Sequence, residues 1–215
     1  MMKGILSGIL SGHNSRIRRV IGKPYNQFSQ RVSIVLMDIY IDHNVWDFLF
    51  DRQIDLMKEL ATSEFALHLT REAEFEIPPT PDHKRRYIEQ TIATCNIDVR
   101  PYFGFYDEQH SSSDQRVGGW GVGYWASEEE MKFIDSQQSR LGANKKRKTR
   151  LFKNEADISL AARSLQSVVL TLDKKAGPLQ DAYRQGGKVV YLTDFDNSGL
   201  SLKDFIMSAL KGTNS

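Results

Sequence analysis

Short apolar runs alternate with longer amphipathic segments along most of the chain. Residues 34–41 form an almost uninterrupted apolar run, which is typical of a strand covered on both faces of a parallel sheet. Further strands are predicted at 65–69, 100–106, 167–172 and 188–192. Helices are predicted between them at 45–60, 71–77, 82–94, 127–138, 154–165, 174–184 and 201–210. This alternation predicts an α/β fold with a parallel, Rossmann-like sheet flanked by helices.

The same pattern divides the chain into three parts. Residues 1–33 show no sustained hydrophobic period, so we interpret them as a basic N-terminal extension. Residues 34–197 carry the alternating elements and are predicted to form one domain. Within this domain, residues from about 98 to 150 are predicted to contain an insertion with a helix and a Gly-rich loop. Residues 198–215 are predicted to provide a C-terminal helix.

The net charge of +2 hides an uneven distribution of charged residues. Residues 1–31 hold six basic residues and residues 139–153 hold seven, and neither segment contains an acid. Of the 29 basic residues, 16 therefore remain against 27 acidic ones, which gives the rest of the chain a charge of −11. An acidic body with two basic segments favours a polyanionic partner and a carboxylate-rich site.

The cysteine content and the hydropathy limit the class of protein further. The single cysteine, Cys95, excludes a disulfide framework and a Cys-x-x-Cys metal or redox site. It fits a reducing compartment, and we expect a cytoplasmic protein. No apolar run approaches the ~18 residues that a membrane helix needs, so no membrane partner is expected.

Acidic residues follow the predicted strands or lie next to them. They are Asp42 after the first strand, Glu72, Glu74 and Glu76 after the second, Asp157 in the first turn of a helix, and Asp173 after the strand at 167–172. The carboxyl ends of parallel strands meet at one sheet edge, so these acids can converge. Crowded carboxylates repel one another unless a cation offsets their charge. An all-oxygen set of ligands favours Mg²⁺ or Mn²⁺.

Four segments of the chain resemble, in order, the motifs of the PIN-domain nucleases. They are Ile39–Trp46, with Asp42 and Asn44; Leu69–Ile77, with Thr70 and Glu76; Asn154–Ala162, with Asp157 before an apolar Ala-Ala helix; and Val168–Asp173, a strand that ends in Thr-Leu-Asp. The order and spacing of the last two segments are the most specific part. The resemblance covers roughly residues 34–192 and implies a PIN-like fold.

The resemblance also implies a function and a set of site residues. The protein would be a metal-dependent endoribonuclease in which a metal-bound water attacks phosphorus. Asp42, Glu76, Asp157 and Asp173 would be the catalytic metal ligands, for Mg²⁺ or Mn²⁺, and Asn44 and Thr171 would be polar supports. Two departures from the family pattern are the longer stretch at 78–153 and the second motif, where Glu72, Glu74 and Glu76 compete for one role.

A basic run precedes the third motif. Its residues are Lys145, Lys146, Arg147, Lys148 and Arg150. The run resembles a nuclear-localisation tetrad, and it could also be a solvated loop. We favour an arm that contacts phosphates, because an acidic body needs local positive charge to accept RNA.

The sequence also allows functions other than a metal-dependent nuclease. The chain could be a catalytically weak PIN-like module that only binds nucleic acid or a partner protein. A phosphatase of the haloacid dehalogenase kind is disfavoured, because Asp42-His43-Asn44 replaces its Asp-x-Asp-x-Thr. The nuclease hypothesis makes single-stranded RNA the candidate partner. Many PIN proteins are toxins of toxin–antitoxin pairs, so an antitoxin protein is a second candidate, and a second copy of the chain is a third.

Overall fold

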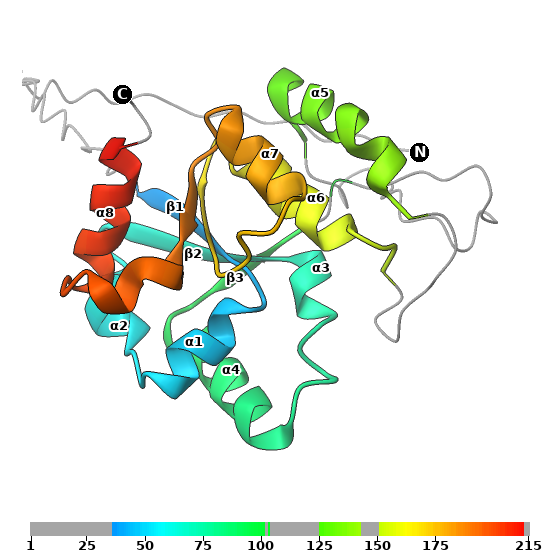
Figure 1. Cartoon of the computed structure of the whole chain (residues 1–215). Coiled ribbons are helices and arrows are strands. Elements are labelled where there is room, and N and C mark those ends of the chain that lie inside the picture. Colours follow the sequence, from blue (N-terminus) through cyan, green and yellow to red (C-terminus); the bar gives the residue numbers. More distant parts are fainter. Residues whose placement is uncertain (1–35, 102, 104–124, 143–150, 213–215) are drawn as a thin grey trace, which may run out of the picture. The chain divides into compact units, whose positions relative to one another are not determined.

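The computed structural model describes residues 36–101, 103, 125–142 and 151–212 (Figure 1). Its strands are β1 (Met37–Ile41), β2 (Phe65–Thr70), β3 (Asp98–Arg100), β4 (Val168–Thr171) and β5 (Val189–Tyr191). Its α-helices are α1 (Val45–Asp51), α2 (Leu56–Glu59), α3 (Arg71–Glu74), α4 (Asp82–Thr94), α5 (Glu128–Gln137), α6 (Glu155–Arg163), α7 (Pro178–Arg184) and α8 (Leu202–Gly212). Two 3₁₀ segments, η1 (Gln138–Arg140) and η2 (Leu192–Asn197), complete the described elements.

The strands form one sheet in the order β3-β2-β1-β4-β5, and every neighbouring pair is parallel. The predicted α/β class and parallel sheet are therefore confirmed. β1 lies at the centre, with Ile39 opposite Leu67 on one side and Val168 on the other. The chain order reverses on either side of β1, so the carboxyl ends of β1 and β4 form the switch point where α/β proteins place their ligands.

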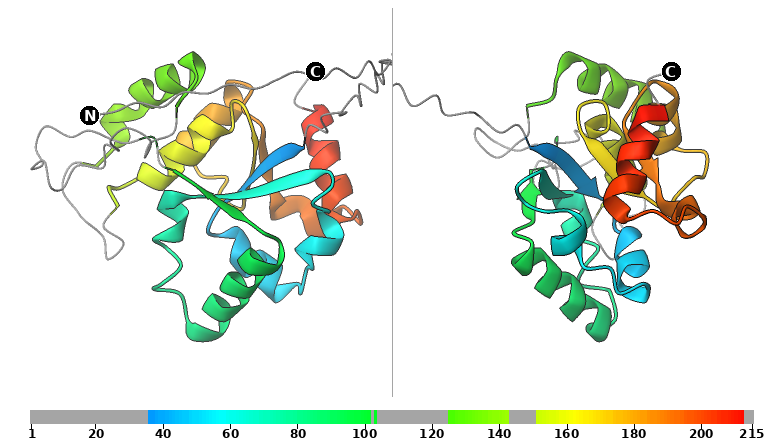
Figure 2. Two further views of the ribbon diagram at one scale, coloured as in Figure 1. Left: turned by 180° about the vertical axis from the view of Figure 1, so that it is seen from behind. Right: turned by 90° about the vertical axis from the view of Figure 1, so that its left-hand side faces the viewer.

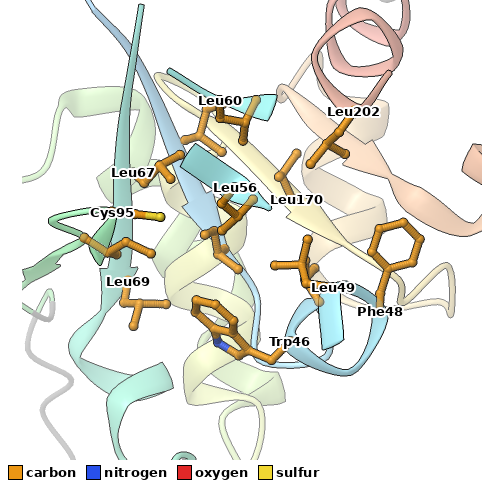
Figure 3. Packing of buried hydrophobic residues seen from close by; sticks show 14 of the residues in the cluster. Trp46, Phe48, Leu49, Leu56, Leu60, Leu67, Leu69, Cys95, Leu170 and Leu202 are labelled. Carbon is orange, nitrogen blue, oxygen red and sulfur yellow. The ribbon is translucent and has the colours of Figure 1, made fainter. Parts of the chain in front are cut away.

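The two faces of the sheet pack into separate hydrophobic clusters. Ile39 and Ile41 belong to the larger cluster, which includes residues of α1, α2, α4 and α8. Figure 2 shows the ribbons of these helices around the sheet, and Figure 3 shows side chains of the cluster from α1, α2 and α8. Tyr40 belongs to the other cluster, with residues of α5, α6 and α7. The alternation of side chains along β1 explains this division. Cys95 is buried in the larger cluster, where it packs as a small apolar residue.

The helix predicted at 45–60 is wrong as a single element, because α1 ends at Asp51 and α2 begins at Leu56. Gln53 has a left-handed backbone with φ of 52°, and the Ile54 amide donates to the Leu49 carbonyl at 3.0 Å. The Asp55 side chain then caps α2 by accepting from the Met57 amide. The break lets the apolar side chains on both sides of the turn enter the same core.

The strand predicted at 100–106 is also misplaced, because β3 occupies Asp98–Arg100 at the edge of the sheet. Pro101 follows directly, and its missing N–H cannot continue a ladder of hydrogen bonds. Most of the predicted insertion, the basic run at 145–150 and residues 1–33 lie outside the described residues. In the described part of the chain, no helix is long and apolar enough to cross a membrane.

Three helix starts follow their local sequence signals. Thr70 caps α3 by accepting from the Ala73 amide at 3.1 Å, although α3 ends at Glu74 and not at Ile77 as predicted. Ser127 and Glu130 form a capping box at the start of α5, inside the helix predicted at 127–138. α7 begins at Pro178, four residues later than predicted, with Pro in the first turn. Residues 172–177 consequently form a loop at the carboxyl end of β4.

Candidate active site at the carboxyl ends of β1 and β4

Asp42 is the most constrained of the predicted site residues. It follows β1 directly, and its amide donates to the Leu170 carbonyl of β4 at 3.0 Å. The residue is only 8% exposed. One carboxylate oxygen, Oδ2, accepts from the Thr171 hydroxyl at 2.6 Å and from the Asn44 side-chain amide at 2.6 Å. The side chain is therefore held in place between the ends of two adjacent strands.

Asn44 and Thr171 tie these strand ends together. The Asn44 Oδ1 atom accepts from the Leu172 amide at 2.9 Å, while its Nδ2 also lies 3.3 Å from the Thr171 hydroxyl oxygen. That hydroxyl oxygen accepts in turn from the Asp173 amide at 3.0 Å. The two residues named as polar supports thus both contact Asp42, and they position the start of the loop that carries Asp173.

The electrostatic setting of Asp42 is unfavourable for a charge. Burial raises the pKa of Asp42 above its ordinary value. Hydrogen bonds from Thr171 and Asn44 oppose this shift, while the nearby negative charge of Asp173 adds to it. A carboxylate removed from water beside a second one costs free energy, and a cation or a proton would relieve this cost.

Asp157 and Asp173 line one cavity of about 390 Å³. Asp173 is oriented by its loop, because its Oδ1 accepts from the Lys175 amide at 2.9 Å. Asp157 is presented by the first turn of α6, which begins after Asn154 in a left-handed conformation with φ of 65°. The structure therefore brings together two of the predicted acids in this acid cavity, and Asp42 lies close enough to Asp173 to feel its charge.

Two basic side chains line the same cavity, and the sequence analysis did not single them out. They are Arg140, from the 3₁₀ turn after α5, and Lys175, from the loop after β4. Arg140 also forms an ion pair with Asp181 of α7 at 2.7 Å. Arg140 was counted in the basic segment 139–153, and Lys175 follows Asp173 by two residues. Only the folded loop shows that both border the acids.

The three glutamates of the second motif lie in different surroundings. Glu74 pairs with Arg71 on the surface of α3. Glu76 lies beyond the end of α3 and is half-buried. Glu72 is buried, with 1% of its surface exposed, and neither of its carboxylate oxygens has a hydrogen bond of normal geometry among the described residues. Glu72, which the sequence left as a competitor, is thus the one acid of the three in the interior.

Glu72 faces α6 from the end of β2. Burial raises its pKa, while the positive charge of Arg163 and the hydroxyl of Ser159, both on α6, act in the opposite direction. Arg163 is itself 1% exposed and donates to the Tyr40 hydroxyl at 3.1 Å and to the Pro101 carbonyl. The position of Glu72 therefore belongs to an interior network between β1, α3 and α6.

The chemistry of the donors fits a hard divalent cation, but a closed cage is not formed. Among the described residues, no group of three or more His, Cys, Asp or Glu side chains is arranged to hold a metal ion. Mg²⁺ commonly takes only one or two carboxylates and keeps several waters. Asp157 and Asp173 line the acid cavity, but a metal site there, with Asp42 or Glu76, stays a prediction.

Comparison with known proteins provides no relative that supports this assignment of the site. No family model, no curated protein and no solved structure matches the chain. The five basic residues named as an RNA-contacting arm lie outside the described residues, so their relation to the cavity stays a prediction as well.

Proposed function

We propose that this protein is a divalent-metal-dependent endoribonuclease with a PIN-like active site at the carboxyl ends of β1 and β4. The observation that carries the proposal is the burial of Asp42 beside Asp173, with two polar side chains arranged to hold it there. An Asp that only ended a strand would face water. Buried carboxylates whose charge costs free energy are instead common at functional sites.

Each residue of the site has a role in this proposal. Thr171 and Asn44 fix the orientation of Asp42. Asp157, from α6, and Asp173, from the loop after β4, present carboxylates to the acid cavity. When bound there, Mg²⁺ or Mn²⁺ would supply an activated water and would stabilise the leaving oxygen of the phosphodiester.

The basic residues of the acid cavity can offset the repulsion between its carboxylates and an RNA phosphate. An RNA phosphate that approaches several carboxylates is repelled unless positive charge lies nearby. Arg140 and Lys175 supply such charge within the acid cavity itself. A planar guanidinium can hold phosphate oxygens in pairs, and a lysine acts as a mobile point charge. We therefore propose that both contact the phosphate of a single-stranded RNA substrate.

The first test measures cleavage of a labelled single-stranded RNA by the full chain. We expect products in Mg²⁺ or Mn²⁺ and none after addition of a chelator, with activity restored by excess metal. Cleavage that continues in chelator would contradict the proposal.

The second candidate, a module that binds RNA without cutting it, is favoured by the open arrangement of the acids. RNA binding without cleavage at any metal concentration would establish it.

A second prediction concerns the basic run. Neutralising Lys145, Lys146, Arg147 and Lys148 together is expected to weaken RNA binding and to flatten its dependence on salt. Each phosphate contact that is lost should lower the slope of log K against log salt by about 0.7 for a single strand. Affinities measured between low and physiological salt check this. An unchanged slope would assign the run to a solvated loop. Toxin activity, an antitoxin partner and a homodimer stay proposals that rest on the PIN resemblance, and a cytoplasmic location stays a proposal that rests on the single cysteine.

A further inference from the structure

A second cavity, of about 610 Å³, lies next to the acid cavity. The loop after β4 separates the two. Asp173 and Lys175 line the acid cavity, whereas Lys174 between them lines the second one. The remaining wall of the second cavity comes from α7, β5 and α8. The loop that presents a proposed metal ligand thus borders both cavities.

Two tyrosines give this second cavity an aromatic lining. Tyr183 projects from α7 and Tyr191 from the end of β5, and their ring centroids are 5.5 Å apart with the planes at 69°. An edge-to-face pair cannot cover both faces of each ring. Tyr183 is 42% exposed, which makes it one of the few large apolar side chains in the described residues that remain open to solvent. The cavity therefore offers a ring surface on which a flat group can stack.

The polar groups around the rings fit a ligand that is both aromatic and anionic. The Lys174 ammonium lies 5.8 Å from the Tyr191 ring centroid and pairs with Asp194 at 2.6 Å. The pair is largely exposed, and such pairs are weak and exchange readily. The Tyr191 hydroxyl is inaccessible to water and has no hydrogen-bond partner among the described residues. The cavity thus combines a π face with a cation that is held in a weak, exposed pair, while the buried Tyr191 hydroxyl takes no part in the lining.

We propose that this cavity binds one nucleobase of the RNA substrate, stacked on Tyr183, with Lys174 contacting the adjacent phosphate. The inference rests on the proposed function, because it places the base next to the phosphate held in the acid cavity. Stacking on a tyrosine tolerates every base, since each base has a π face. The cavity would therefore hold the strand in register and add little sequence preference.

The test compares the parent and three variants on one labelled single-stranded RNA of ten nucleotides, in chelator so that no cleavage occurs. Tyr183→Leu keeps an apolar side chain but removes the ring, and it is expected to weaken binding by about 5- to 150-fold. Tyr183→Phe keeps the ring and should bind as the parent does. Met57→Ala is the matched control, because it removes an exposed apolar side chain that lines a different cavity. Melting temperatures verify that all variants fold.

A second set of oligonucleotides locates the stacked base. One abasic site is moved along the RNA, and at one position the advantage of the parent over Tyr183→Leu should disappear. If the parent binds and cleaves RNA while Tyr183→Leu matches its affinity, the stacking site is wrong and the nuclease proposal stands. Equal losses in Tyr183→Phe and Tyr183→Leu would replace stacking by a role of the hydroxyl. A parent that neither binds nor cleaves RNA overturns both proposals.

Discussion

Replacing Asp42 by Asn is expected to lower the rate of RNA cleavage by about 100-fold or more, while RNA binding persists or tightens. Changes around a metal ligand typically cost 10- to 100-fold, and loss of the ligand charge itself should cost at least as much. The same substitution removes one negative charge beside Asp173, which relieves repulsion of the phosphate. Cleavage rate and RNA affinity are measured on the same preparation, with and without Mn²⁺.

The difference in melting temperature between Asp42→Asn and the parent should depend on pH in a defined direction. Because the pKa of Asp42 is raised in the folded protein, the folded state binds the proton more tightly than the unfolded state does. The resulting stabilisation is complete below the ordinary pKa of 3.8 and is lost as the pH rises through the raised value. Asn carries no such charge, so the melting temperature of Asp42→Asn should exceed that of the parent more at neutral pH than at acidic pH.

Asp51→Asn is the matched control for this experiment. Asp51 is the last residue of α1 and is exposed, so the change removes the same charge from a solvated position. It should leave cleavage unchanged, and its effect on the melting temperature should be small at every pH. An Asp42→Asn variant that cleaves RNA at the rate of the parent would end the assignment of a metal ligand at this position.

Much of the site could be predicted because it depends on strand ends. The apolar run that becomes β1 stops at Asp42, and the run that becomes β4 stops at Thr171, so parallel pairing alone brings these residues together. Asn44 could be placed at the same strand ends because it lies two residues beyond Asp42. Local periodicity places each of these residues, because each lies within three positions of a buried strand, whereas the supporting roles of Asn44 and Thr171 came from the resemblance to the PIN motifs.

The second acid could not be predicted, since it depends on where a short helix ends. Glu72 and Glu76 would share one face of a continuous helix, but α3 stops at Glu74. Packing against α6, and not the local sequence, decides that Glu72 turns inward. Arg140 and Lys175 were missed for a related reason. They come from a 3₁₀ turn and a loop, whose side-chain directions no periodicity describes.

The second large effect is expected on stability, from Arg163→Met. Arg163 is buried, donates to the Tyr40 hydroxyl and the Pro101 carbonyl, and offsets the buried charge of Glu72. Met keeps much of the volume but removes the charge and both donors. Breaking a buried charged network from one side typically costs about 3–5 kcal/mol, because the remaining groups stay desolvated without a partner. We expect a loss of that size in the free energy of unfolding in urea at neutral pH.

The loss should be smaller at acidic pH, because a protonated Glu72 no longer needs a compensating charge. Burial already raises the pKa of Glu72, and removal of the Arg163 charge, which opposes that shift, should raise it further. Adding Glu72→Gln to Arg163→Met should therefore recover part of the stability at neutral pH and little at acidic pH. Equal costs for Arg163→Met at both pH values, with no recovery in the double variant, would show that Arg163 acts only through Tyr40 and Pro101. Recovery that depends on pH would establish that Glu72 is held as a charged group between α3 and α6.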